Sequence, residues 1–383
     1  MKRKLIIYIA VLAAIIGCRT DETINYAEET ETGVPGSPTV QAELAGMYVL
    51  NEGNMGSNKC TLDYLDFCSG IYTRNMYAMV NPGVPMELGD VGNDIQIYGS
   101  QLWMVINCSN KVEVCQASDA KRIGLVDIPN CRYVTFDGGY AYVSSYVGPV
   151  TIDPNARKGR VYKVDTLTLT VVDTVTVGYQ PEEMAVVDGK LYVANSGGYR
   201  VPNYDHTVSV IDLETFEEER TIDVAINLHR CRADQYGNLW VTSRGDGYDE
   251  PARLYCLSRE GDGPMNVTSV FDISISDLCI VGDSLYYIGS SFNYITMENE
   301  LSMGILDIRK YELVTGTVFD SPKIEEIKMP YGIIVNPIDR DFYLMDAMDY
   351  VTPGKLLHFK ADGTFDFEVR TGDIPGHAAF LWK

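Results

Sequence analysis

Hydrophobic and polar positions follow a pattern that recurs along the chain. Each copy contains an aromatic residue flanked by apolar neighbours in a short strand-like run, and seven such runs are centred on Tyr48, Trp103, Tyr142, Tyr192, Trp240, Tyr286 and Tyr343. The intervals between these residues are 55, 39, 50, 48, 46 and 57 positions. A repeat of about 40–50 residues that holds several short strands is typical of a β-propeller. We therefore expect the five central tyrosines to lie in strands and to pack between blades.

The fourth copy shows the repeating unit most clearly. Residues 183–187 form an apolar run, Asp188-Gly189 is a tight-hairpin signal, and residues 190–195 form a second run. Residues 207–211 alternate as a third strand, and residues 219–224 form a more polar fourth. This gradient from apolar to charged strands fits radial packing, because only the outermost strand of a blade faces solvent.

The two ends of the repeat region complement each other. The region starts at Met47 with a second-type strand and ends with an apolar strand from His377 to Trp382 that has no successor. We predict that this last strand becomes the innermost strand of the first blade and removes an open edge. The predicted fold is all-β, a seven-bladed β-propeller of four-stranded blades over residues 45–383. Six or eight blades are the alternatives, because the first and sixth intervals are long.

The first residues carry the features of an export signal. Lys2-Arg3-Lys4 precedes an apolar run from Leu5 to Ile16, which is too short to span a bilayer comfortably. Residues 1–17 are therefore predicted to be a signal peptide. The sequence Ile15-Ile16-Gly17-Cys18 resembles a bacterial lipobox, which implies cleavage before Cys18 and lipidation of its thiol. An ordinary signal peptide followed by an incidental cysteine is the alternative.

Residues 18–44 differ in composition from the repeat region. They contain several acidic residues and threonines and the turn-rich stretch from Gly33 to Pro38, with few side chains to bury. We predict an acidic flexible tether here. Acidic residues shortly after a lipidated cysteine resemble the surface-export signals of Bacteroidetes lipoproteins. The expected location is the cell surface, on the outer membrane, with the lipid anchor as the chain's attachment.

Charge and cysteine usage narrow the possible partners and ligands. The formal net charge is −22, which argues against nucleic acid or anionic lipid as the main partner. Beyond Cys18 there are eight cysteines, none in a Cys-x-x-Cys pair, so the sequence gives little support for a zinc site. Cys108 and Cys131 could meet as a disulfide; small hydrophobic side chains in strands are the alternative interpretation.

One face of the predicted ring collects aromatic and polar loop residues. The loops that follow the second strands and those that precede the first strands emerge on the same face of a propeller. Tyrosine offers a flat apolar surface with few torsions to freeze, and Asn and Arg add directional hydrogen bonds. Local packing against glycine-rich turns is the alternative for each tyrosine. The predicted ligand contacts are Asn51, Asn107, Arg132, Tyr146, Asn195, Tyr199, Tyr204, Arg230, Arg244, Tyr248, Tyr294, Tyr331 and Asp346.

Catalytic and metal signatures are weak. The four histidines do not fall beside a Gly-x-Ser-x-Gly elbow or in a His-Glu-x-x-His string. Residues 246–250 could bind calcium, but an acidic turn is favoured. A lactonase-type site in the central channel would need carboxylates and a histidine, and only His229 and His377 lie at the entries of first strands. We predict a chain that is not an enzyme and has no cofactor or catalytic residue, with a hydrolase or an adhesion module for glycan or protein as alternatives.

The fourth repeat also carries a resemblance. Val177-Gly-Tyr-Gln-Pro181, followed by residues 184–195 ending in Leu-Tyr-Val-Ala-Asn, resembles the YVTN repeat of YncE-like seven-bladed propellers. With the lipobox, the acidic segment and the opening Tyr48-Val-Leu-Asn-Glu-Gly-Asn54, the chain is similar to the BtuG-type surface lipoproteins of gut Bacteroides. The resemblance implies capture of cobalamin or another corrinoid as a ligand and its transfer to a BtuB-like TonB-dependent outer-membrane transporter.

Overall fold

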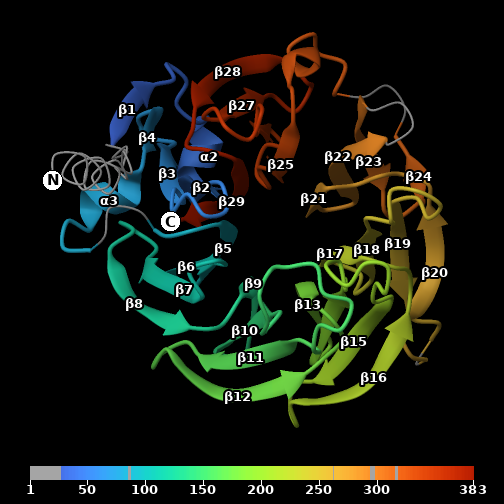
Figure 1. Ribbon diagram of the computed structural model, residues 1–383. Helices are drawn as coiled ribbons and strands as arrows, with labels where there is room; N and C mark the ends of the chain where they lie inside the picture. The colour runs from blue at the N-terminus through green and yellow to red at the C-terminus, as the bar shows by residue number, and fades with distance from the viewer. Residues whose placement is uncertain (1–26, 85–87, 262, 294–297, 315–317) are drawn as a thin grey trace, which may run out of the picture.

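The computed structural model describes residues 27–383 except 85–87, 262, 294–297 and 315–317. It is a ring of seven antiparallel sheets arranged around a central axis (Figure 1). The innermost strands of successive sheets contact one another around the whole ring. The seven-bladed propeller predicted from the repeat is therefore confirmed. None of the described helices is long and apolar enough to cross a membrane.

The first blade contains both ends of the ring. From the channel outward its strands are β29 (Pro375–Trp382), β2 (Leu44–Asn51), β3 (Thr61–Asp66), β4 (Ile71–Arg74) and β1 (Glu28–Glu31). β29 pairs antiparallel with β2, with Tyr48 opposite Ala379 and Leu44 opposite Trp382. The predicted closure of the ring by the C-terminal strand is confirmed.

The other six blades each contain four strands in chain order from the channel outward. Blade 2 contains β5 (Gly92–Tyr98), β6 (Gln101–Ile106), β7 (Lys111–Gln116) and β8 (Arg122–Asp127), and blade 3 contains β9 (Cys131–Asp137), β10 (Tyr140–Ser145), β11 (Arg160–Asp165) and β12 (Thr170–Thr176). Blade 4 contains β13 (Pro181–Val187), β14 (Lys190–Asn195), β15 (Thr207–Asp212) and β16 (Glu217–Asp223), and blade 5 contains β17 (Leu228–Ala233), β18 (Leu239–Ser243), β19 (Arg253–Ser258) and β20 (Asn266–Phe271). Blade 6 contains β21 (Asp277–Val281), β22 (Ser284–Asn293), β23 (Glu298–Asp307) and β24 (Glu312–Leu313), and blade 7 contains β25 (Pro330–Val335), β26 (Phe342–Asp346), β27 (Lys355–Phe359) and β28 (Phe365–Arg370).

The segment before the ring differs from the flexible tether predicted over residues 18–44. β1 pairs with β4 as a fifth strand, and α2 (Pro38–Glu43) follows it. The side chain of Ser37 accepts a hydrogen bond from the Val40 amide and so caps the helix. Val40 is buried in a cluster with Leu65 and Phe67. The apolar residue Val40 is the feature of the sequence that indicates packing against the ring. The prediction of a tether rested on the acidic composition of the whole segment instead.

The core lies between the faces of neighbouring blades. Each described core cluster joins adjacent blades; one, for example, unites Trp103 and Val105 of blade 2 with Val134 and Val143 of blade 3. All five central tyrosines of the repeat are buried, as predicted, which leaves their rings as packing elements. The remaining helical elements, α3 (Met76–Val80) and η1 (Ile324–Glu326), lie outside the channel.

The innermost strands are interrupted where they begin. Ladder pairing shifts register between Gly92 and Asp94 in β5, between Pro181 and Met184 in β13, and between Leu228 and Cys231 in β17. A bulge of this kind bends the strand and re-aims its side chains. The bulges therefore place polar side chains at one mouth of the channel, which is where the candidate site lies.

In three of the innermost strands, β5, β13 and β21, a carboxylate accepts a hydrogen bond from a backbone amide of the next blade. Asp94 accepts a hydrogen bond from the amide of Val134 at 2.9 Å. The same contact recurs two blades further on, where Glu183 accepts from Cys231, and again where Asp277 accepts from Ile333. Because the acceptor lies one blade before the donor, these bonds fix the innermost strands relative to one another. The channel wall is consequently pre-organised.

Candidate binding site

A cavity of about 700 Å³ opens at this mouth of the channel. All seven blades contribute to its wall, through second-strand ends, the loops that follow them and the beginnings of innermost strands. This is the face that the sequence predicted for a ligand. Its volume lies within the range of about 300–1,000 Å³ that is usual for small-molecule sites.

Seven of the thirteen predicted ligand contacts lie in the wall of this cavity. Tyr199 is 36 % exposed, so its ring is directly available to a ligand. Tyr331 packs edge-on against Tyr350, with ring centroids 5.8 Å apart, and forms a second aromatic corner. The seven are Asn107, Arg132, Tyr199, Tyr204, Arg230, Arg244 and Tyr331.

Three predicted contacts instead hold the fold together. Asn51 and Asn195 are fully buried at the ends of second strands and donate to hydroxyls of the third strands, Thr61 and Ser209. Asp346, at the equivalent position of blade 7, accepts hydrogen bonds from backbone amides. A buried polar group requires such partners. These side chains do not line the cavity because they satisfy the ends of their own blades.

The remaining three predicted residues lie in different places. Tyr146 was predicted to contact the ligand, but it is 3 % exposed and does not line the cavity. Tyr248 is 77 % exposed and does not belong to the cavity wall. Tyr294 lies outside the described residues.

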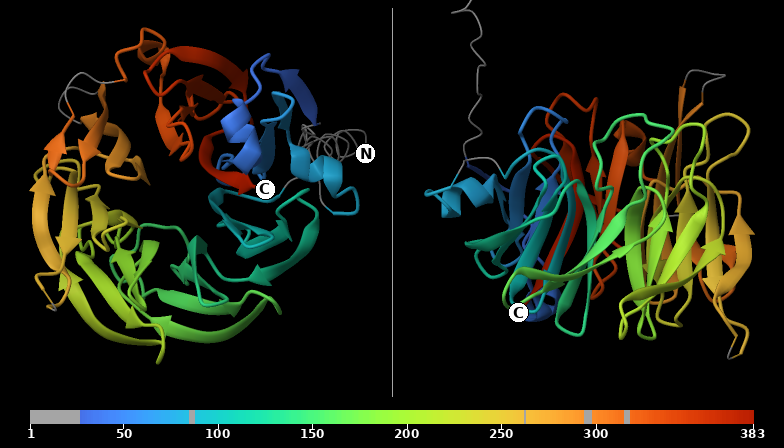
Figure 2. Two further views of the ribbon diagram at one scale, coloured as in Figure 1. Left: turned by 180° about the vertical axis from the view of Figure 1, so that it is seen from behind. Right: turned by 60° about the horizontal axis from the view of Figure 1, so that its bottom comes forward.

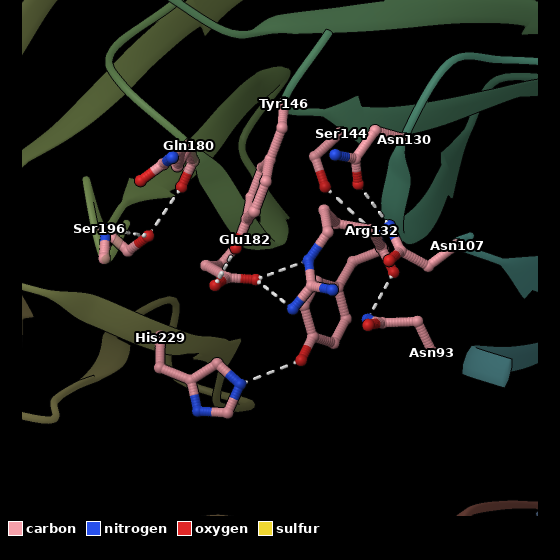
Figure 3. Close-up of polar contacts among 12 residues, drawn as sticks. Asn93, Asn107, Asn130, Arg132, Ser144, Tyr146, Gln180, Glu182, Ser196 and His229 are labelled. Carbon is pink, nitrogen blue, oxygen red and sulfur yellow. Dashed lines mark hydrogen bonds and ion pairs between the residues drawn. The ribbon is translucent and has the colours of Figure 1, made fainter. Parts of the chain in front are cut away.

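A buried carboxylate organises one side of the site. Glu182, in the bulge of β13, is fully buried, and its two oxygens contact Arg132 at 3.1 Å and Arg244 at 3.2 Å. The hydroxyl of Tyr146 donates to the same carboxylate at 2.5 Å. Figure 3 shows Arg132 and Tyr146 converging on Glu182. Sequence reasoning missed Glu182, although an acidic pair directly after Pro181 in an otherwise apolar strand was the signal.

The ionisation of Glu182 follows from these contacts. Burial acts to raise the pKa of its carboxyl, but the charges of Arg132 and Arg244 and the hydrogen bond from Tyr146 lower the pKa below the usual value. Glu182 is therefore an anion at neutral pH. It holds two guanidinium groups at fixed positions on the cavity side.

Tyr133 connects a second group of polar side chains, which also contains His229 and Arg230. Its hydroxyl lies 2.8 Å from Nε2 of His229 and accepts a hydrogen bond from Nη1 of Arg230 at 3.2 Å. Burial lowers the pKa of His229 well below its ordinary value, and the neighbouring arginines lower it further. The imidazole is therefore neutral at pH 7. Burial also raises the pKa of Tyr133 to about 12, so its hydroxyl stays protonated.

The opposite side of the cavity carries a carboxylate of its own. Glu52 follows β2 and accepts a hydrogen bond from the Tyr331 hydroxyl at 2.9 Å. Its other oxygen lies 3.4 Å from Nε2 of His377, at the beginning of β29. The wall thus has an arginine-rich side and a side built from Glu52, Tyr331 and His377.

The structure also decides between the alternatives given for Cys108 and Cys131 and for residues 246–250. Cys108 and Cys131 are both free, and the thiol of Cys131 points to the backbone carbonyls of Ile106 and Lys111. Asp246 accepts hydrogen bonds from the amides of Tyr248 and Glu250, which is an acidic turn. No group of three or more potential metal ligands occurs among the described residues.

Comparison with known proteins identifies the fold. No protein-family model matches the sequence, and no curated protein matches it. Similar solved structures include a candidate 6-phosphogluconolactonase from Bacteroides fragilis, with a TM-score of 0.60 and 10 % identity over 88 % of this chain and 98 % of that one. A quinonprotein alcohol dehydrogenase-like protein from Bacteroides thetaiotaomicron has a TM-score of 0.58 and 12 % identity over 88 % and 78 %. The hydrazine synthase of Kuenenia stuttgartiensis has a TM-score of 0.54 and 15 % identity over 74 % and 86 %. At these identities the likeness concerns the propeller fold.

Proposed function

We propose that this chain is a binding protein that captures a corrinoid, such as cobalamin, in the cavity and passes it to a TonB-dependent outer-membrane transporter. The observation that carries the proposal is the composition of the wall, which combines tyrosine rings with amide and guanidinium groups on a rigid ring. A corrinoid presents a flat macrocycle surrounded by amide side chains. Aromatic surfaces match the macrocycle, and the polar groups match the amides.

The resemblance to BtuG-type lipoproteins supports the same ligand. Its opening stretch ends in Glu52-Gly53-Asn54, and these three residues lie in the cavity wall. The end of the motif thus lies at the candidate site, whereas its first four residues, Tyr48 to Asn51, lie in the core. Hydrogen bonds between blades fix the wall before the ligand binds. The entropic cost of ordering the wall on binding should therefore be small.

The direction of the first strand supports transfer to a membrane partner. Glu28 of β1 pairs with Arg74 at the end of β4, so the chain enters the ring on the cavity side. Nine residues separate Cys18 from Glu28, and a fully extended chain of that length reaches about 30 Å. An anchor at Cys18 would hold the cavity face close to the membrane, where a transporter could receive the ligand.

Calorimetric titration of the purified protein with cyanocobalamin tests this function. We expect saturable binding of one corrinoid per chain with micromolar or stronger affinity, because the cavity is preformed and has aromatic walls. Absence of heat and of any shift in the cobalamin absorption spectrum at micromolar concentrations would contradict the proposal. Binding of a glycan or protein instead would favour an adhesion module.

Hydrolysis of a lactone is the second candidate function. The observation that favours it is the pair of Glu52 and His377 at 3.4 Å in the cavity wall, since a carboxylate-oriented imidazole can act as a general base. Turnover of a lactone by the wild-type protein, lost in His377→Gln, would favour this function. Cyanocobalamin binding without turnover would favour capture.

A further inference from the structure

Positive charge gathers on one side of the cavity. Arg132 of β9, Arg230 of β17 and Arg244 after β18 all lie in its wall, although the chain as a whole has a net charge of −22. The three residues come from blades 3 and 5, which the inter-blade contacts through Glu182 connect. Because the protein as a whole is acidic, its overall composition does not explain this cluster of arginines.

The nearby carboxylate does not neutralise the guanidinium groups that share it. Glu182 is one anion between two cations, Arg132 and Arg244, so one positive charge remains in excess. Arg230 differs, because it pairs with Asp277 at 3.2 Å and donates to the carbonyl of Ser276. The excess charge therefore belongs to the side of the cavity where Arg132 and Arg244 meet.

The acidic residues of the cavity wall are engaged elsewhere. Asp246 accepts from backbone amides of its own turn. Glu52 is bound to Tyr331 and His377 on the opposite side. Neither carboxylate has a described ion pair with Arg132 or Arg244, so the two guanidinium groups share Glu182 as their described anionic partner.

Arg244 also has hydrogen-bond donors to spare. Within the described part of the chain, Nη1 is the atom of its guanidinium that contacts a partner, at 3.2 Å from Glu182. Its side chain is 38 % exposed. The planar fork of a guanidinium fits two oxygens of a phosphate, sulfate or carboxylate at once. Arg244 is thus held by one edge, with further N–H groups open to the cavity.

We propose that Arg132 and Arg244 form a subsite for an oxyanion carried by the ligand, of which a phosphoryl group is the best match. The inference rests on the proposed function and deepens it by naming the part of the ligand that this side of the cavity recognises. In a corrinoid with a nucleotide loop, the group is the phosphodiester. Cobinamide lacks that loop and cannot make the contact.

A histidine beside the cluster supplies an independent readout. Burial and the charges of Arg244, Arg230 and Arg132 lower the pKa of His229, with a smaller contribution from His377; the Tyr133 hydroxyl contacts its ring. An oxyanion at the subsite offsets the arginine charges. The pKa of His229, followed by NMR, should therefore rise when inorganic phosphate binds and should not move on addition of chloride at equal ionic strength.

The direct test measures the affinity for inorganic phosphate in the wild-type protein and in Arg244→Gln. The variant should lose about tenfold or more in affinity, because it loses a charge-assisted hydrogen bond to the phosphate. Arg259→Gln is the matched control, since Arg259 pairs with Asp188 in a hairpin on the opposite face. Melting curves confirm folding, and Arg244→Lys, which keeps the charge beside Glu182 but lacks the fork, should also bind more weakly. Equal phosphate affinity in wild type and Arg244→Gln, or an equal loss in Arg259→Gln, would overturn the subsite.

Corrinoid titrations separate failure of the subsite from failure of the proposed function. If the subsite exists, Arg244→Gln weakens the binding of cyanocobalamin by a larger factor than the binding of cobinamide. Cyanocobalamin binding that is insensitive to Arg244→Gln would overturn the subsite and leave corrinoid capture standing. Arg244-dependent phosphate binding without any corrinoid binding would support the subsite and overturn corrinoid capture.

Discussion

Removing residues 376–383 should abolish cooperative folding of the ring. These residues form most of β29, which supplies the innermost strand of blade 1 and pairs with β2 along its whole length. Phe380 packs against Phe67 and Tyr343 of the neighbouring blade, so the loss exposes core on two blades. The cost should be comparable to the about 5–15 kcal/mol that stabilises a whole domain. Thermal unfolding followed by circular dichroism should lose its single sharp transition.

A truncation at the other end of the same sheet provides the control. A chain that begins at Gly33 lacks β1, whose four residues are all exposed on the outer edge of blade 1. It should melt close to the intact protein, because no described core residue is removed. If the shortened C-terminus melted as sharply and at the same temperature as the intact chain, closure by β29 would not be what holds the ring together.

Glu182→Gln should lower the free energy of unfolding by about 3–5 kcal/mol, the usual cost of removing one partner of a buried ion pair. The substitution replaces the fully buried carboxylate of residue 182 with a neutral amide, so Arg132 and Arg244 lose the anion that they share. Denaturant unfolding at pH 7 measures the change. Glu326→Gln is the matched control, because Glu326 contacts Lys323 with its side chain 64 % exposed, and an exposed pair contributes at most about 1 kcal/mol. A loss as small in Glu182→Gln as in this control would contradict the account of the site.

The same contact gives the sign of a pH dependence. The folded pKa of Glu182 lies below the ordinary carboxyl value, so its contribution to stability is fully present above the unfolded pKa. That contribution is lost as the pH falls through the folded pKa. The difference in unfolding free energy between wild type and Glu182→Gln should therefore shrink in acid. A difference that grew as the pH fell would contradict this assignment.

The sequence predicted the ring because the repeat reports burial. An aromatic residue flanked by apolar neighbours marks a central strand, and Tyr48, Tyr142 and Tyr192 are buried as expected. The closure by the last strand followed from an unpaired strand at each end. Strand β1 was not predicted, because its residues, Glu28 to Glu31, are exposed and polar and pair through the backbone.

The face of the site was predictable, but the individual side chains were only partly so. Loop position correctly located Tyr199, Tyr331 and Arg244 at the cavity. It could not separate these from Asn195, which occupies a strand end and turns inward to Ser209. Glu182 was missed because a bulge in the innermost strand decides where its carboxylate points, and the bulge depends on contacts between blades.

The affinity for cyanocobalamin of two tyrosine variants tests the central claim that this cavity binds the ligand. Tyr199 lies at the cavity and Tyr236 in a hairpin of the opposite face; both are exposed loop tyrosines, 36 % and 51 % respectively. Figure 2 shows the two faces of the ring from the side. Tyr199→Ala should weaken binding by a factor of about ten or more, as truncation of an aromatic anchor does, while Tyr236→Ala should bind like wild type. Normal binding by Tyr199→Ala together with loss of binding in Tyr236→Ala would contradict the account.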